Sequence, residues 1–310
     1  VSEIGFGAWG IGGDSYGNVS DEESKKALRV ALGIGVNFID TSNLYGQGHS
    51  EELIGEVLLG ARSKTIVASK GGTLPHQGFF MPQDFSKKHL TNALENSLKR
   101  LKTDYIDLYQ LHSPAIEELT KNNDLIRETL EKFKVEGKIR AYGVSVKSPQ
   151  DAMTVINELG YECVQVNYNM IDQRAREIGL FDLAHKLNIG IIVRTPFVFG
   201  FLTGKMTGDE DFSSNDHRRN WPKPQLERWA NAPKLFDGLI DGKKRTMAQL
   251  ALKFCLSNSA VSTVIPGMIN EREVKENVIS TGLADLEEWE VHHIYSVYRD
   301  NAFYDKNAKK

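Results

Sequence analysis

The fold is decided by the stretch Val36-Asn37-Phe38-Ile39-Asp40-Thr41-Ser42-Asn43-Leu44-Tyr45-Gly46. Its first four residues form a short, largely apolar run that suits a buried strand and is too short for a core helix. The run ends at the carboxylate of Asp40, and the phenol of Tyr45 follows before a turn glycine. α/β enzymes build their sites from such side chains at the carboxyl ends of strands. A capping Asp beside a surface Tyr would look the same, so the rest of the chain decides between the two interpretations.

Short apolar runs alternate with amphipathic helix patterns along the rest of the chain. Residues 20–32 illustrate the helix pattern, with Ser20 and Glu23 in capping-box spacing before a stripe of Ala and Leu. The predicted strands are 2–6, 36–39, 65–69, 105–111, 141–144, 163–167, 190–193 and 261–265. The predicted helices are 20–32, 50–59, 86–101, 125–136, 148–159, 175–187, 246–256 and 271–280, with an extra helix at 286–299.

This alternation predicts an α/β fold, a (β/α)8 TIM barrel formed by one domain over residues 1–310. The strands are short and poorly alternating, as expected of strands buried on both faces. A long irregular loop, 198–245, lies before the seventh helix, and the last helix lies outside the repeat. A doubly wound parallel sheet is the alternative, since the sequence does not reveal strand order.

Composition narrows the function classes. The 310 residues are 40% hydrophobic and 25% charged, with a net charge of −3 and no Lys/Arg cluster, which argues against nucleic-acid binding. No run of 18 apolar residues exists, so no membrane-spanning helix is expected. Cys163 and Cys255 offer neither a disulfide framework nor metal-ligand spacing, so we expect no metal and a reducing, cytoplasmic compartment. The chain begins at Val1 rather than at Met, so we expect its true start to be missing.

A literal G-x-G-x-x-G fingerprint occurs at Gly5-Phe6-Gly7-Ala8-Trp9-Gly10. The dinucleotide-binding form of this motif needs a helix that starts at the glycines. Here the glycines continue into a loop, and the helix pattern begins only at Ser20. The Rossmann interpretation of this motif is therefore disfavoured.

Polar side chains that can donate or accept protons or hydrogen bonds lie at the end of nearly every predicted strand. A barrel would bring these side chains together on one rim, although each residue type alone is common at structural positions. They are Asp40, Lys70, His112, Ser145, Gln165 with Asn167, and Arg194 with Thr195.

The chemistry of this set is coherent. A phenol has a pKa near 10, so it is a sluggish proton donor unless a neighbouring ammonium favours the phenolate. Lys70 would supply the ammonium, Asp40 would hold it, and a neutral His112 would direct a carbonyl oxygen by hydrogen bonding. The set suits protonation of a carbonyl oxygen as its carbon is reduced, with the hydride supplied by an organic cofactor.

Several motifs make the sequence resemble the aldo-keto reductase family over essentially its whole length, and more closely the bacterial type related to channel β subunits. The motifs are Gly7-Ala8-Trp9-Gly10, Phe38-Ile39-Asp40-Thr41, Tyr45-Gly46 with Ser50-Glu51, Val67-Ala68-Ser69-Lys70, Asp104-Tyr105-Ile106-Asp107-Leu108-Tyr109-Gln110-Leu111-His112, Gly143-Val144-Ser145, Gln165-Val166-Asn167-Tyr168-Asn169, Gly200-Phe201-Leu202-Thr203-Gly204-Lys205 and Val264-Ile265-Pro266-Gly267. The resemblance implies a barrel that reduces aldehydes or ketones with NAD(P)H bound on the carboxyl rim. It implies a catalytic tetrad of Asp40, Tyr45, Lys70 and His112, with Tyr45 as general acid. Trp9, Tyr45 and His112 would contact the substrate.

The resemblance also implies a set of cofactor contacts. They are Gly7, Ala8, Trp9, Asp40, Ser145, Gln165, Asn167, Arg194, Thr195, Pro196, Phe197, Gly200, Leu202, Gly204, Lys205, Pro266, Gly267, Met268, Arg272, Glu273 and Asn277. This chain departs from the family pattern at three places. Val146 replaces an Asn that holds the carboxamide, Arg194 stands where an aromatic ring commonly stacks on the nicotinamide, and Glu273 stands where Arg or Gln is common. NADPH is expected, with Arg272 reaching its 2′-phosphate; Glu273 leaves NADH as the alternative.

Two other functions stay open. One is a regulatory or sensor subunit that keeps the fold and binds nucleotide with slow or no turnover. The other is a barrel isomerase or lyase that uses Lys70 as base or Schiff-base amine. The sequence identifies neither the carbonyl substrate nor the oligomeric state. Loop aromatics would line an apolar substrate pocket or serve only loop packing; they are Phe79, Phe80, Met81, Phe85, Phe197, Phe199, Trp221 and Trp229.

Overall fold

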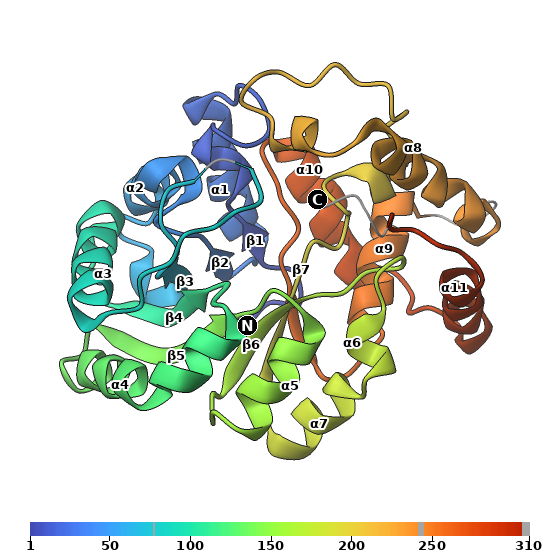
Figure 1. Cartoon of the computed structure of the whole chain (residues 1–310). Coiled ribbons are helices and arrows are strands. Elements are labelled where there is room, and N and C mark those ends of the chain that lie inside the picture. The colour runs from blue at the N-terminus through green and yellow to red at the C-terminus, as the bar shows by residue number, and fades with distance from the viewer. Residues whose placement is uncertain (77, 241–244, 306–310) are drawn as a thin grey trace.

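The computed structural model describes residues 1–76, 78–240 and 245–305. Its strands form one eight-stranded sheet in which each strand pairs in parallel with the next along the chain (Figure 1). The strands are β1 (Phe6–Gly7), β2 (Phe38–Asp40), β3 (Ile66–Gly71), β4 (Ile106–His112), β5 (Ile139–Ser145), β6 (Cys163–Asn167), β7 (Gly190–Arg194) and β8 (Val261–Val264).

Backbone hydrogen bonds join the first strand region to the last and close the sheet into a barrel. The N–H of Gly5 donates to the carbonyl of Val264 at 2.8 Å, and the N–H of Val264 donates to that of Glu3 at 2.8 Å. The N–H of Gly7 donates to the carbonyl of Pro266 at 2.9 Å. The predicted (β/α)8 barrel is confirmed, since a doubly wound sheet would have a different strand order and open edges.

The helices surround the strands (Figure 1). They are α1 (Asp21–Gly33), α2 (His49–Val57), α3 (Lys87–Leu101), α4 (Ile116–Val135), α5 (Pro149–Asn157), α6 (Arg174–Glu177), α7 (Leu180–Leu187), α8 (Lys223–Asn231), α9 (Met247–Leu256), α10 (Glu271–Ile279) and α11 (Glu288–Asp300). Their apolar stripes pack on the barrel, where Leu28, Leu94 and Leu130 are completely buried. No helix in the described ranges is long and apolar enough to cross a membrane.

Three predicted helix starts are confirmed by their caps. The hydroxyl of Ser86 accepts from the backbone N–H of His89. Ser148 and Thr246 each complete a capping box, and Pro149 takes the first helical position after Ser148. The predicted capping box at Ser20 is wrong, because its side chain makes no capping bond although it is the N-cap of α1.

The helix predicted to begin at Ser50 begins slightly earlier, and Ser50 does not cap it. Gly48, in the left-handed region at φ 102°, is the N-cap of α2, and Ser50 lies inside the first turn. Its buried hydroxyl donates to the carbonyl of Ala8 at 2.9 Å and contacts the hydroxyl of Thr41 at 2.9 Å. Ser50 therefore ties α2 to the ends of β1 and β2.

The long segment before the seventh barrel helix contains more regular structure than predicted. Residues Lys223–Asn231 form α8, whose Leu226 and Trp229 are buried. Tertiary packing thus stabilises a helix in a stretch where Pro and polar residues obscured the pattern. Elsewhere α4 begins at Ile116, earlier than predicted, and the first strand shortens to Phe6–Gly7.

Candidate functional site

The carboxyl ends of the strands carry the polar residues that the sequence singled out. Asp40 ends β2, His112 ends β4, Ser145 ends β5 and Arg194 ends β7, while Lys70 is the next-to-last residue of β3. Register pairs His112 with Ser145 and Asn167 with Arg194 across neighbouring strands. Parallel pairing therefore brings these side chains onto one rim of the barrel.

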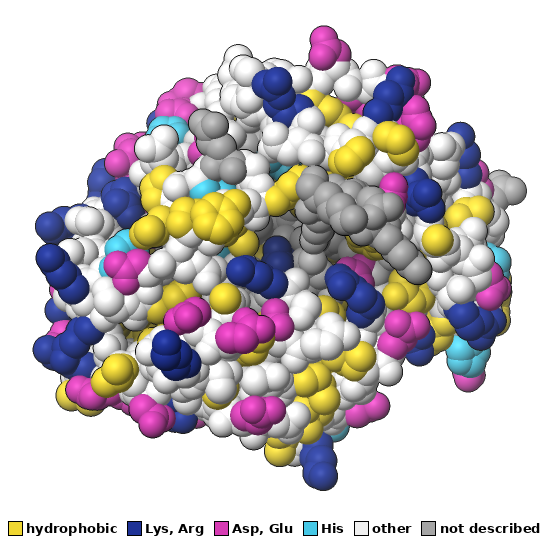
Figure 2. Space-filling view, viewed as in Figure 1, with side chains coloured by type: hydrophobic (Ala, Val, Ile, Leu, Met, Phe, Trp, Pro, Cys, Tyr) yellow, Lys and Arg dark blue, Asp and Glu magenta, His cyan; other side chains and the backbone are white. Residues whose placement is uncertain are grey.

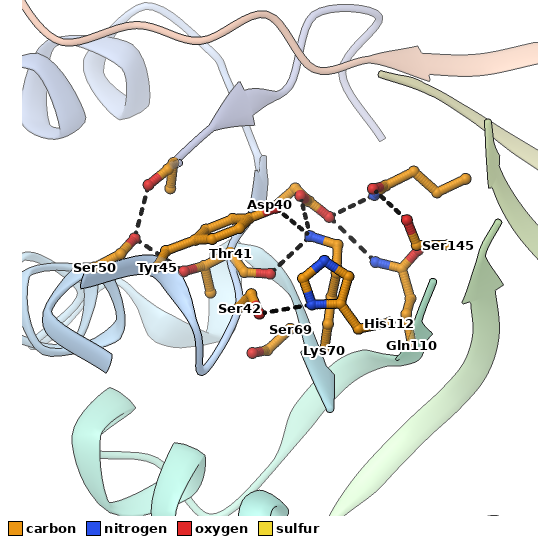
Figure 3. Close-up of polar contacts among 12 residues, drawn as sticks. Asp40, Thr41, Ser42, Tyr45, Ser50, Ser69, Lys70, Gln110, His112 and Ser145 are labelled. Atoms are coloured by element: carbon orange, nitrogen blue, oxygen red, sulfur yellow. Dashed lines mark hydrogen bonds and ion pairs between the residues drawn. The ribbon is translucent and has the colours of Figure 1, made fainter. Parts of the chain in front are cut away.

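Lys70 is the centre of this cluster (Figure 3). Its ammonium donates to Oδ1 of Asp40 at 2.5 Å, to the carbonyl of Thr41 at 2.9 Å and to the phenolic oxygen of Tyr45 at 3.2 Å. Its side chain is fully buried, and that of Asp40 is 2% exposed. All three protons of the ammonium have partners, so Lys70 is held in one orientation toward Tyr45.

The second carboxylate oxygen of Asp40 accepts two amide hydrogen bonds. Gln165 donates to Oδ2 at 2.7 Å and Gln110 at 3.1 Å. The hydroxyl of Ser145 in turn donates to Oε1 of Gln165 at 3.0 Å. The buried carboxylate is thereby held from both oxygens, which compensates for its removal from water.

His112 faces Tyr45 across the rim. Their ring centroids lie 6.2 Å apart with the planes at 85°. Nδ1 of His112 lies 3.2 Å from the hydroxyl oxygen of Ser42 (Figure 3). The phenol and the imidazole therefore converge on one space, as a pair of groups directed at a single oxygen atom requires.

Burial dominates the proton affinities of these groups. Burial raises the pKa of Tyr45 above its usual value, although Lys70 pulls it down. Lys70 acts in the expected direction, toward the phenolate, but burial has the larger effect and the pKa of Tyr45 is raised. Burial opposes the charge on Lys70, yet Asp40 and Tyr45 together raise its pKa. Burial, with the charges of Lys70 and Arg194, holds the pKa of His112 well below its usual range, so the imidazole is neutral.

Arg194 extends the cluster toward β5. Its guanidinium donates to the carbonyl of Val146 at 3.0 Å, and its buried Nε has no hydrogen-bond partner within the described ranges. Beyond it, Thr195, Val198 and Phe199 adopt positive φ of 60°, 48° and 58°. Such strain in residues other than glycine concentrates at functional sites. This turn and the unpartnered Nε of Arg194 fit a polar ligand on the rim.

The remaining candidate cofactor residues differ in whether their side chains are buried or already bound to another residue. Thr195 donates to the side chain of Asn167 at 3.0 Å, so these two side chains bind one another. Leu202, Met268 and Asn277 are buried, so these residues expose little surface to a ligand. The other members of the predicted set are Gly7, Ala8, Trp9, Pro196, Phe197, Gly200, Gly204, Lys205, Pro266, Gly267, Arg272 and Glu273.

Three charged members of this set differ in what they already bind. Lys205 pairs with Glu276 at 3.1 Å. Glu273 accepts from the backbone N–H of Ile269 at 3.0 Å and from the side chain of Asn270 at 3.1 Å, so its carboxylate braces the turn before α10. Arg272 is exposed and lines a surface hollow. Arg272 is thus the best placed of the three for an incoming phosphate.

Aromatic side chains from two loops meet beside the cluster. Phe79 contacts Trp221 at a centroid distance of 4.8 Å, and Phe199 lies 6.4 Å from Trp9. Figure 2 shows hydrophobic side chains beside a hollow on this face. Trp229 is fully buried and belongs to the core. The predicted aromatic set therefore divides between loop packing and surroundings of the site.

Sequence reasoning missed several participants. Gln110 lies two residues before His112 in β4, so the alternation of a strand could have identified it. Ser42 lies inside the opening motif without any distinguishing signal. The ring of His217, from the long segment before α9, lies against that of Trp9 at a centroid distance of 4.4 Å, with the planes tilted by 33°. No sequence pattern connects two residues so far apart.

A barrel with this rim defines a class of α/β-barrel oxidoreductases, and residues 3–299 match the family model for the aldo/keto reductase family. The chain belongs to this family. The family and fold support NADPH-dependent oxidoreductase activity in general.

Individual relatives agree with the family. The chain is 30% identical to an uncharacterized oxidoreductase, YqkF, from Bacillus subtilis, covering 96% of this chain and 92% of the relative. It is 31% identical to the aldo-keto reductase yakc [NADP(+)] from Schizosaccharomyces pombe, covering 89% and 83%. Among solved structures, the holo form of aldo-keto reductase AKR11C1 from Bacillus halodurans superposes with a TM-score of 0.78 at 30% identity, covering 99% and 95%.

Proposed function

We propose that this chain is an NADPH-dependent carbonyl reductase that converts aldehydes or ketones to alcohols, with Tyr45 as general acid. One observation carries the proposal: the buried ammonium of Lys70 contacts both Asp40 and the phenolic oxygen of Tyr45. These contacts hold the phenol of Tyr45 in one position from which it can donate its proton. The ammonium of Lys70 then stabilises the phenolate that remains.

The residues present fit a nicotinamide dinucleotide. The buried, unpartnered Nε of Arg194 and the strained turn at 195–200 supply polar groups on the rim, and exposed Arg272 suits a 2′-phosphate. When bound, NADPH would supply the hydride that the carbonyl carbon accepts. The relative yakc carries NADP(+) in its name, which supports the choice of NADPH for this chain.

The protein's own groups then handle the carbonyl oxygen. Neutral His112 directs this oxygen toward Tyr45 by hydrogen bonding. As the carbon gains the hydride, the phenol of Tyr45 transfers its proton to the oxygen and an alcohol forms. Lys70 stabilises the resulting phenolate, and Asp40 keeps the ammonium in place. Water then returns a proton to Tyr45.

The substrate surroundings in this proposal are Trp9, Tyr45 and His112, with loop aromatics beside them. The proposal includes a single barrel domain and a cytoplasmic location, the latter supported by Cys163 and Cys255, which are both free thiols.

The test follows the absorbance of the reduced cofactor while aldoses, aromatic aldehydes, methylglyoxal and keto-sugars are offered in turn. We expect oxidation of NADPH with at least one class. Tyr45→Phe should lower this turnover by about 10²–10⁴-fold with an unchanged Kd for NADPH. Tyr105→Phe, at a tyrosine that packs under Arg62 and Arg140, is the matched control and should keep full activity.

Three outcomes would contradict the proposal. Near-parental turnover in Tyr45→Phe would remove the role assigned to Tyr45. Tight cofactor binding without oxidation across the whole panel would instead favour a nucleotide-binding sensor. Loss of activity after borohydride treatment in the presence of a carbonyl would point to a Schiff base on Lys70.

A further inference from the structure

Ser42 links the segment that carries Tyr45 to the imidazole of His112 (Figure 3). The carbonyl of Ser42 accepts the backbone N–H of Tyr45 at 3.1 Å, which closes the turn that presents the phenol. Its hydroxyl oxygen lies 3.2 Å from Nδ1 of His112. The residue is completely buried, so bulk water does not compete for this contact.

The hydroxyl of Ser42 has one proton and three polar neighbours. The backbone N–H of Leu44 donates to the hydroxyl oxygen at 3.2 Å and occupies a lone pair. The hydroxyl can donate its proton either to Nδ1 of His112 at 3.2 Å or to Oδ1 of Asn43 at 3.3 Å. Asn43 is half-buried and its oxygen can accept from solvent. Nδ1 of His112 contacts no other donor in the described part of the chain.

Because His112 is neutral, the acceptor of the Ser42 proton determines which tautomer the imidazole adopts. Its pKa is held well below the usual range by burial and by the neighbouring cations, so the ring is neutral at physiological pH. A neutral imidazole carries a proton on one nitrogen and a lone pair on the other. The group that binds Nδ1 therefore decides what Nε2 presents to its surroundings.

We propose that Ser42 is a positioning residue that donates its hydroxyl proton to Nδ1 of His112 and so fixes the tautomer protonated at Nε2. This inference rests on the proposed function, in which His112 donates a hydrogen bond to the carbonyl oxygen of the substrate. The other tautomer would present a lone pair at Nε2 and repel that oxygen. Ser42 thus holds His112 as a donor while its backbone holds the turn that presents Tyr45.

Kinetics of three variants test the effect on the reaction. Ser42→Ala removes the donor and should lower kcat/KM for the carbonyl substrate by about tenfold, with an unchanged Kd for NADPH. Ser42→Thr keeps a hydroxyl and should restore kcat/KM to within about threefold of the parent. Asn43→Ala removes the competing acceptor and should leave kcat/KM unchanged. A large loss in Asn43→Ala together with full activity in Ser42→Ala would overturn the proposal.

Nitrogen-15 NMR of the histidine side chains reports the tautomer without any turnover. The signals of His112 are assigned by their loss in His112→Gln. We expect a pyrrole-like Nε2 and a pyridine-like Nδ1 in the parent, and a shift toward the opposite tautomer in Ser42→Ala. A protonated Nδ1 in the parent, or an unchanged tautomer in Ser42→Ala, would overturn the proposal. The expected tautomer combined with full carbonyl reduction in His112→Gln would instead overturn the proposed function of His112.

Discussion

The side-chain amide of Gln165 donates to Oδ2 of Asp40 at 2.7 Å, although 125 residues separate them in sequence. The family resemblance implies only that Gln165 contacts the cofactor. Its contact with Asp40 adds a second duty, since Asp40 in turn holds Lys70. Gln165 therefore connects β6 to the buried ion pair on β2 and β3.

Gln165→Leu should destabilise the protein. The variant removes one of the two amide donors to a buried carboxylate and leaves the hydroxyl of Ser145 without its acceptor. A hydrogen bond to a charged group contributes about 1.5–3 kcal/mol, so the free energy of unfolding in urea should fall by that amount. Gln150→Leu, at an exposed position on α5, should change it little. Equal stabilities for the two variants would show that Gln165 does not support Asp40.

Lys70→Met should change the pH dependence of carbonyl reduction. Reduction needs the protonated phenol, so activity falls as the pH rises through the pKa of Tyr45. Burial already raises that pKa, and Lys70 lowers it. Removing the ammonium should therefore move the alkaline limb to still higher pH and lower kcat by about 10²–10⁴-fold.

Circular dichroism of Lys70→Met must first confirm folding, because Asp40 then lacks its cation. Lys64→Met, at an exposed position before β3, provides the matched control. An alkaline limb at its parental position, with parental kcat, would mean that Lys70 does not act on Tyr45.

His217 should make stability depend on pH. Burial lowers the pKa of His217 to about 4, whereas an unfolded histidine has a pKa of about 6.5. The unfolded chain binds more protons between these values, so the free energy of unfolding falls as the pH is lowered from about 6.5 to 4. The slope from one such group is at most about 1.4 kcal/mol per pH unit.

Unfolding in urea at several pH values measures this slope. His217→Phe keeps an aromatic ring beside Trp9 but cannot bind a proton, so its slope should be shallower than that of the parent. The contribution of His112, whose pKa is also lowered, is common to both proteins. His185→Phe, at an exposed site on α7, is the surface control. Identical slopes in all three proteins would refute the prediction.

Arg272 and Glu273 should affect the cofactor differently. Arg272→Ala should raise the Kd for NADPH by up to roughly fivefold, as expected for the loss of an exposed charge pair, and leave the Kd for NADH unchanged. The carboxylate of Glu273 braces the turn before α10, so Glu273→Gln should weaken both cofactors alike by loosening that turn. Titration of both cofactors, with Arg29→Ala as a surface control, measures the ratio of their Kd values. An improved preference for NADPH in Glu273→Gln would show instead that Glu273 faces the ribose.

Glu51 should be a major contributor to stability. It is fully buried and receives two bonds from Arg100, at 2.8 and 2.7 Å, and one from Ser69 at 2.6 Å. Glu51→Ala leaves Arg100 without its partner and should cost about 3–5 kcal/mol of unfolding free energy. The neighbouring Glu52→Ala, at an exposed position on the same helix, should cost less than about 0.5 kcal/mol. A small effect at Glu51 would mean that water reaches the pair after truncation.

The barrel could be predicted from the sequence because strands that are buried on both faces appear in it as short apolar runs. The position of Asp40 and Lys70 at strand ends followed from the same pattern. Partners across the barrel could not be predicted, since the contact of Gln165 with Asp40 depends on closure of the ring rather than on spacing. The direction of the Tyr45 pKa shift could not be predicted from the sequence either, because it depends on burial as well as on the neighbouring charge.

Closure of the barrel also limits when the chain can fold during synthesis. The hydrogen bonds between Glu3–Gly5 and Val264 join segments about 260 positions apart. Until Val264 has emerged from the ribosome, β1 has β2 as its single neighbour and its other edge is open. Open parallel strands fold slowly and aggregate readily. The first strand therefore waits longest after its own synthesis for its second neighbour, and its open edge is exposed to intermolecular pairing during that time.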